Sequence, residues 1–134
     1  MAGTVDHPIT IERGAHRMRV RFAGRTIADS TRALLLREAS YKPVAYIPRQ
    51  DVDMTLLTRT DRKTRCPYKG DASYYSIHVD GVGDAGGTDG ADGGGRIAEN
   101  AVWSYEQPLP DVAEISGHLA FYPDRVEVIE QLPL

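Results

Sequence analysis

The residues best suited to chemistry lie close together near the middle of the chain. Residues 66–70 read Cys-Pro-Tyr-Lys-Gly and place the only cysteine, a lysine and a tyrosine around a Pro/Gly turn. Cys66 could be a nucleophile if Lys69 or a histidine favoured its thiolate form, or it could be a small buried hydrophobe. Lys69 could contact an anion beside Gly70, where the bare backbone permits close approach, or extend into solvent.

Aromatic residues on the following strands could complete a ligand cleft with this turn. Trp103 and Tyr105 alternate along a predicted strand and therefore share a face. Tyr68, or one of Tyr74 and Tyr75, would lie on the neighbouring strand, and because Tyr74 and Tyr75 point to opposite faces only one of them can join. Such rings could stack on a flat or cationic ligand, and the alternative is a core cluster.

Two alternating segments must position these rings. Residues 73–79 and 97–105 both alternate between apolar and polar side chains, which predicts two strands that pair with each other. The intervening residues 80–95 consist almost wholly of Gly, Asp and Ala. That composition buries too little apolar area to offset its ordering entropy, so we expect a flexible insert at 80–95.

Short strands dominate the rest of the chain. Residues 30–38 fit either a short helix or a buried strand, and the β-rich surroundings favour the strand. Residues 51–57 and 111–116 predict short helical turns. We expect the remaining strands at 9–12, 18–22, 25–29, 44–47, 119–122 and 126–129, with the last two forming a hairpin through a turn at 123–125.

Length, composition and charge describe an ordinary globular chain. Its 134 residues are 41% hydrophobic and 26% charged, which predicts a single domain over 1–134. The formal net charge of -3 disfavours nucleic-acid binding. A lone cysteine excludes an internal disulfide, and the absence of a long apolar run or a basic N-terminal segment argues against a membrane span or a secretory signal. We therefore expect a cytoplasmic protein.

Several motifs in this order resemble a small family of unknown function whose domain label is nucleotidyltransferase-like. The resemblance runs from about residue 7 to residue 129 and rests on the segments 29–33, 46–49, 66–70, 99–106 and 118–123. It implies a mainly β fold of the β-tent type, in which two small antiparallel sheets lean on each other with one or two short helical turns. It implies no established activity.

The family label raises the question of a catalytic metal. Nucleotidyl transfer uses carboxylates to hold a divalent cation, and Asp51 and Asp53 have a fitting Asp-x-Asp spacing. They also fit the alternative role of capping a helical turn, which we favour because no Gly-Ser loop precedes them. A single cysteine cannot form a four-thiolate zinc site. We expect no metal and no cofactor.

These observations lead to a function hypothesis with two alternatives. The first is a small-molecule-binding domain with a cleft formed by Cys66, Tyr68, Lys69, Gly70, Trp103 and Tyr105. The second is an enzyme that uses Cys66 or Lys69 in the same cleft. The third is a protein-interaction domain that uses sheet edges and aromatic patches.

Overall fold

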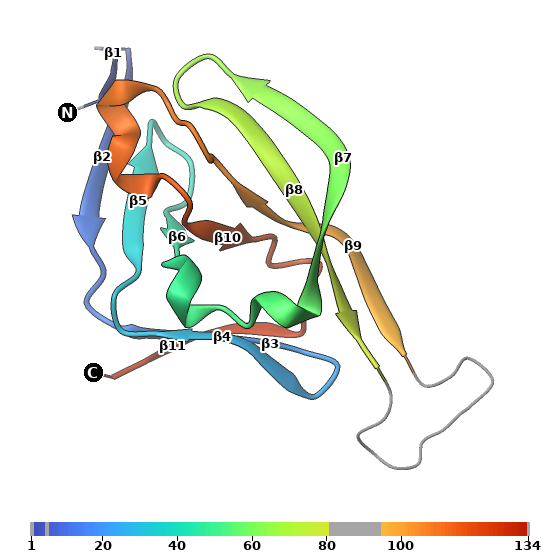
Figure 1. Cartoon of the computed structure of the whole chain (residues 1–134). Helices are drawn as coiled ribbons and strands as arrows, with labels where there is room; N and C mark the ends of the chain where they lie inside the picture. Colours follow the sequence, from blue (N-terminus) through green and yellow to red (C-terminus); the bar gives the residue numbers. More distant parts are fainter. Residues whose placement is uncertain (1, 5, 81–94, 134) are drawn as a thin grey trace.

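The expectation of a mainly β chain is confirmed. The computed structural model describes residues 2–4, 6–80 and 95–133, so most of the insert predicted at 80–95 lies outside the described residues. The described strands form three antiparallel sheets, where the family resemblance implied two. In Figure 1, β7, β8 and β9 of the central sheet lie on the right, β2, β5 and β6 on the left, and β3, β4 and β11 at the bottom.

Each sheet gathers strands from separate parts of the chain. The N-terminal sheet has the order β1-β2-β5-β6, the central sheet β10-β9-β8-β7 and the small sheet β11-β3-β4. The strands are β1 (Ala2–Thr4), β2 (His7–Arg13), β3 (Arg17–Phe22), β4 (Arg25–Ser30), β5 (Leu34–Glu38), β6 (Val44–Tyr46), β7 (Leu57–Cys66), β8 (Gly70–Val79), β9 (Arg96–Ser104), β10 (Leu119–Phe121) and β11 (Val128–Leu132). Short 3-10 turns lie at η1 (Arg49–Asp51), η2 (Met54–Leu56) and η5 (Pro110–Ile115).

The central sheet packs on both faces, and the side chains that alternate along β8 enter two different cores. Tyr75 and Ile77 belong to a core shared with the small sheet, in which Val20 and Ile27 are buried. Tyr74 points the other way, into a core shared with the N-terminal sheet. The second core also contains Ile9, Leu36, Tyr46, Ala72, Tyr105, Val112, Ile115 and Ala120. The predicted pairing of the two alternating strands is confirmed, because Tyr74 lies opposite Trp103.

The predicted hairpin of 119–122 with 126–129 is wrong. β10 pairs with β9, with Leu119 opposite Ser104, whereas β11 pairs with β3 in another sheet. The residues at 123–125 reverse the chain locally, but burial decides the partners. All three residues of β10 are buried in the central sheet, which leaves β11 to complete the small sheet.

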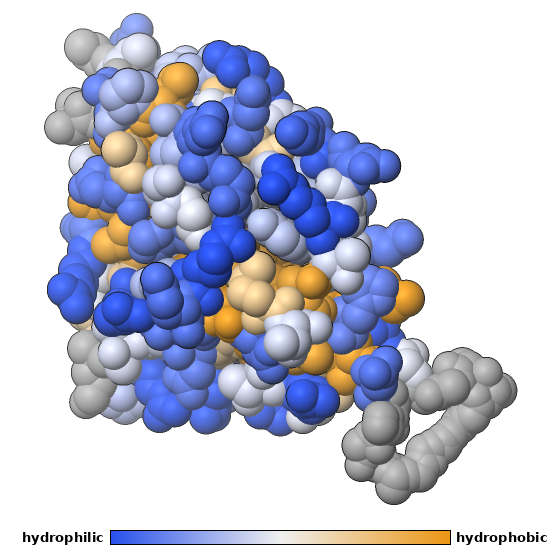
Figure 2. Space-filling model, viewed as in Figure 1, coloured by the Kyte–Doolittle hydropathy of each residue, from blue (hydrophilic) through white to orange (hydrophobic). Residues whose placement is uncertain are grey.

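β7 was not predicted from the sequence, because its side chains are mostly polar. It is an edge strand of the central sheet, and Arg62, Lys63 and Arg65 on it are exposed. Charged side chains on an edge strand oppose pairing with another chain, which accounts for a strand without apolar alternation. Hydrophilic residues cover this edge in Figure 2.

Two bulges interrupt the central sheet on either side of β8. On β7, residues 60–62 lie opposite Tyr74 alone, between the pairs Arg59–Tyr75 and Lys63–Ser73. On β9, residues 99–101 lie opposite Ser76, between the pairs Val102–Tyr75 and Ala98–Ile77. Bulges bend strands and change the direction of the side chains beside them. These two bulges therefore alter which side chains project from the face of the sheet that carries Tyr74.

Candidate functional site

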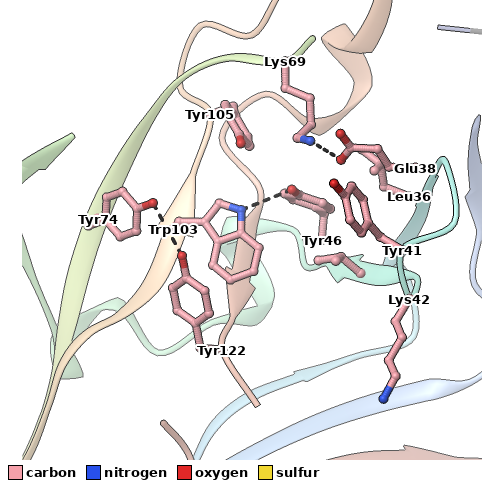
Figure 3. Close-up of a pocket in the computed structure, with 11 residues that line it drawn as sticks. Leu36, Glu38, Tyr41, Lys42, Tyr46, Lys69, Tyr74, Trp103, Tyr105 and Tyr122 are labelled. Atoms are coloured by element: carbon pink, nitrogen blue, oxygen red, sulfur yellow. Dashed lines mark hydrogen bonds and ion pairs between the residues drawn. The ribbon is translucent and has the colours of Figure 1, made fainter. Parts of the chain in front are cut away.

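A cavity of about 190 Å³ lies between the central and N-terminal sheets. We call it the aromatic cavity, because five tyrosines and the only tryptophan contribute to its lining. Figure 3 shows side chains from both sheets converging on it. Its lining residues are Leu36, Glu38, Tyr41, Lys42, Val44, Tyr46, Lys69, Tyr74, Trp103, Tyr105 and Tyr122.

A buried ion pair closes one side of the aromatic cavity. Lys69, in the turn between β7 and β8, is 7% exposed, and its Nζ donates to Glu38 Oε1 at the end of β5. The other Glu38 oxygen lies 2.6 Å from His7 Nε2. The Glu38 carboxylate therefore ties the β7–β8 turn to β2 and to its own strand, and it compensates the charge of a lysine that has little contact with water.

The environment of Glu38 favours its ionised form. Burial acts to raise the pKa of this carboxyl, but the hydrogen bonds with Lys69 and His7 outweigh burial and lower the pKa below its ordinary value of 4.5. A carboxyl whose pKa is lower in the folded state stabilises the fold above its unfolded pKa. That contribution is lost as the pH falls through the folded pKa.

We therefore expect the difference in stability between wild type and a Glu38→Gln variant to become smaller at acid pH. The difference between their free energies of unfolding should shrink as the pH falls below the ordinary carboxyl pKa of 4.5 and through the lower pKa of the folded state. Urea denaturation across this range measures the difference, and the subtraction removes the contributions of the other carboxyls. A difference that grows towards acid would contradict the assignment.

Aromatic contacts fix the wall opposite the ion pair. The Trp103 indole Nε1 donates to the Tyr46 hydroxyl at 3.1 Å, and these two rings meet edge to face. The Tyr122 ring lies 4.4 Å from the Trp103 ring, centroid to centroid, at an angle of 43°. Because Trp103 is held by both neighbours, its face is presented to the cavity in a defined orientation.

Burial keeps the hydroxyls of Tyr46, Tyr105 and Tyr122 neutral at physiological pH. Burial raises the pKa of Tyr46 and of Tyr105 well above the ordinary value, and it raises the pKa of Tyr122 to about 12. The Tyr105 hydroxyl has no hydrogen-bond partner among the described residues, although Tyr105 is only 6% exposed. Figure 3 shows this hydroxyl directed into the space between Lys69 and Trp103.

Half of the predicted site residues line the aromatic cavity. Lys69, Trp103 and Tyr105 do, and they come together from the β7–β8 turn and from β9 and its C-terminal end. The other predicted site residues, Cys66, Tyr68 and Gly70, are absent from its lining.

Those three residues have contacts elsewhere. Cys66 packs against the core between the central and N-terminal sheets. The Tyr68 ring stacks on the His7 imidazole, with centroids 3.9 Å apart. Gly70 has a φ of +113°, which favours glycine, and it lies against the backbone of residues 107–109. Its conformation accounts for a glycine at this turn.

Residues that sequence reasoning missed complete the lining. Glu38 closes the ion pair, and Leu36, Tyr46 and Tyr122 form walls. No spacing in the sequence links Glu38 with Lys69, which is 31 residues away. Tyr46 and Tyr122 lie inside two of the segments that carry the family resemblance, so those segments were the available signal for them.

The carboxylates considered for a metal have other partners. Asp51 accepts from Ser30 Oγ at 2.6 Å and pairs with Arg32 at 3.0 Å, and Asp53 caps η2 by accepting from the Thr55 amide. Within residues 2–4, 6–80 and 95–133, no group of three or more His, Cys, Asp and Glu is placed to hold a metal ion. The described part of the chain also contains no helix with the length and apolar character needed to cross a membrane.

Comparison with known proteins gives a family and no activity. A family model described as a domain of unknown function (DUF427), with a nucleotidyltransferase-like label, matches residues 10–132. No curated protein matches the chain.

Proposed function

Because the chain belongs to the DUF427 family of domains of unknown function, which prescribes no reaction, we propose a function from the site itself. The protein binds a small molecule whose planar ring occupies the aromatic cavity and carries a polar substituent. The single observation that carries this proposal is the buried Tyr105 hydroxyl, which lines the cavity without a partner among the described residues.

The size of the aromatic cavity supports one six-membered ring. Its volume is about 190 Å³. An apolar cavity of about 150 Å³ is sufficient to bind benzene in another protein. The Trp103 and Tyr122 rings and the edge of Tyr46 offer aromatic surfaces for offset or edge-to-face contact with such a ring.

The polar groups of the cavity support a substituent on that ring. A buried hydroxyl without a partner costs about 1–3 kcal/mol in desolvation, and a ligand oxygen facing Tyr105 would recover part of this free energy. Tyr46 already accepts from Trp103, so its own proton can serve as a second donor. Lys69 and Glu38 neutralise each other, which makes a neutral ring the fitting occupant of this part of the site.

Binding is favoured over catalysis by the same contacts. Cys66 does not line the cavity, and the Lys69 ammonium is engaged by Glu38. Neither side chain is therefore presented to a bound ring as a free nucleophile.

Titration with p-cresol tests the proposal. It is a six-membered ring with one hydroxyl, and Trp103 is the only tryptophan, so its emission on red-edge excitation reports on the cavity. We expect saturable binding to wild type and an affinity roughly two- to tenfold weaker in Tyr105→Phe, which removes one hydrogen bond. Tyr68→Phe is the matched control, because Tyr68 stacks on His7 and does not line the cavity, so this variant should bind as wild type does. Linear, unsaturable quenching in wild type would contradict the proposal.

A further inference from the structure

A second cavity, of about 420 Å³, adjoins the aromatic cavity. Tyr122 lines both cavities, and its hydroxyl lies 3.5 Å from that of Tyr74, which lines the aromatic cavity. We call the second cavity the polar basin, because every other residue of its lining is charged or carries an amide. These residues are Arg62, Glu99, Asn100, Asp124 and Arg125.

The two bulges of the central sheet build the polar basin. Arg62 comes from the bulge on β7, and Glu99 and Asn100 come from the bulge on β9. Asn100 has a φ of +49° inside a strand, and its side-chain oxygen accepts from Thr60 Oγ1 at 2.6 Å across β8. This contact links the bulges and leaves the amide NH₂ of Asn100 available for the basin. A residue held in this backbone region within a sheet is a feature that often accompanies a binding site.

The charged side chains of the basin do not form ion pairs with one another. None of Arg62, Arg125, Glu99 and Asp124 forms a side-chain ion pair within 4.0 Å among the described residues. Arg62 lies over the Tyr74 ring, 4.9 Å from its centroid, and donates to the Tyr74 hydroxyl, which still leaves other N–H donors of its guanidinium for a ligand. Arg125 gives one N–H to the Glu99 carbonyl at 2.7 Å and retains its other donors.

The basin therefore offers two positive and two negative side chains beside a site for one ring. A simple anion would meet the two carboxylates, and a simple cation would meet the two guanidinium groups. A group that carries both charges is matched by this set, because each of its charges finds opposite partners.

We propose that the polar basin binds the zwitterionic head group of the ligand whose ring occupies the aromatic cavity. This inference rests on the proposed function. Arg62 and Arg125, with the Asn100 amide, hold the carboxylate, and Glu99 and Asp124 hold the ammonium. An aromatic α-amino acid is the simplest ligand of this class, with its side chain beyond Tyr122 and its head group at the bulges.

Four related probes separate the two parts of the site. L-tyrosine carries both charges, tyramine lacks the carboxylate, 3-(4-hydroxyphenyl)propionate lacks the ammonium, and p-cresol lacks both. Isothermal titration of the full-length protein should give the tightest binding for L-tyrosine, with a loss of about fivefold or more for each missing charge.

The two arginines of the basin should contribute to binding only through the carboxylate of the ligand. In an Arg62→Gln/Arg125→Gln variant, L-tyrosine should bind no better than tyramine does, and p-cresol should keep its wild-type affinity. Tyramine should bind at least as tightly as to wild type, because the substitutions remove two positive charges beside its ammonium. Lys63→Gln is the matched control, because Lys63 is exposed on the same strand as Arg62 and does not line the basin. It should leave all four affinities unchanged.

Two outcomes would overturn the head-group inference without contradicting the proposed binding of a ring in the aromatic cavity. One is equal affinity for L-tyrosine and p-cresol. The other is a preference for L-tyrosine that survives the double arginine substitution. Failure of p-cresol itself to bind would contradict the proposed function, and the head-group inference would fall with it.

Discussion

Replacing Glu38 with alanine is expected to lower the free energy of unfolding by about 3 kcal/mol, because the substitution leaves a buried ammonium without its counter-charge. The side chains of Lys69 and Glu38 are only 9% and 14% exposed, so water cannot replace the lost carboxylate without opening the site. His7 loses its partner at the same time. Urea denaturation monitored by circular dichroism measures the change.

Two further variants distinguish this cause from a general loss of packing. Adding Lys69→Met to Glu38→Ala removes the uncompensated charge, so the double variant should be more stable than Glu38→Ala alone. Glu12→Ala removes the partner of Arg37 in an ion pair whose side chains are about half exposed, and it should change stability by less than about 1 kcal/mol. A double variant no more stable than Glu38→Ala would refute the explanation.

Replacing Trp103 with alanine is expected to weaken p-cresol binding by at least about tenfold, because it removes the principal aromatic wall of the cavity. The protein should remain folded, since Trp103 is half-buried and lies beside the second core rather than within it. We expect a stability loss of about 1–2 kcal/mol, below the 3–5 kcal/mol typical of a fully buried tryptophan. Isothermal titration is the appropriate readout, because the substitution also removes the fluorescent reporter.

Tyr68→Ala provides the matched control for Trp103→Ala. Tyr68 is also half-buried and aromatic, but it stacks on His7 and does not line the aromatic cavity. It should bind p-cresol as wild type does. Equal loss of binding in both variants would show that the effect of Trp103→Ala is not specific to the cavity.

The strands with alternating apolar and polar side chains could be predicted from the sequence. The alternation in residues 73–79 and 97–105 indicated two paired strands, and β8 and β9 do pair, with Tyr74 opposite Trp103. The strands predicted at 18–22 and 25–29 leave only Ala23 and Gly24 between them, and the positive φ angles of both residues match a tight hairpin. In residues 30–38 the preference for a strand is confirmed by β5.

Features that depend on distant contacts could not be predicted. The polar strand β7 is specified by its place at a sheet edge rather than by alternation. The separation of β10 from β11 depends on which sheet buries each strand, and the turn between them carries no such information. The ion pair of Lys69 with Glu38 and the bulges at residues 60–62 and 99–101 likewise arise only once the sheets are assembled.

Nuclear magnetic resonance of the full-length protein tests the central claim, a ring bound in the aromatic cavity, most directly. Trp103 supplies the only indole N–H signal in the chain, and this group donates to Tyr46 at the cavity wall. Addition of p-cresol should shift that signal saturably, together with the amide signals of Tyr46 and Lys69, and should leave β3 and β11 of the small sheet unchanged. An indole signal that stays in place while signals elsewhere shift, or a shift that never saturates, would contradict the account.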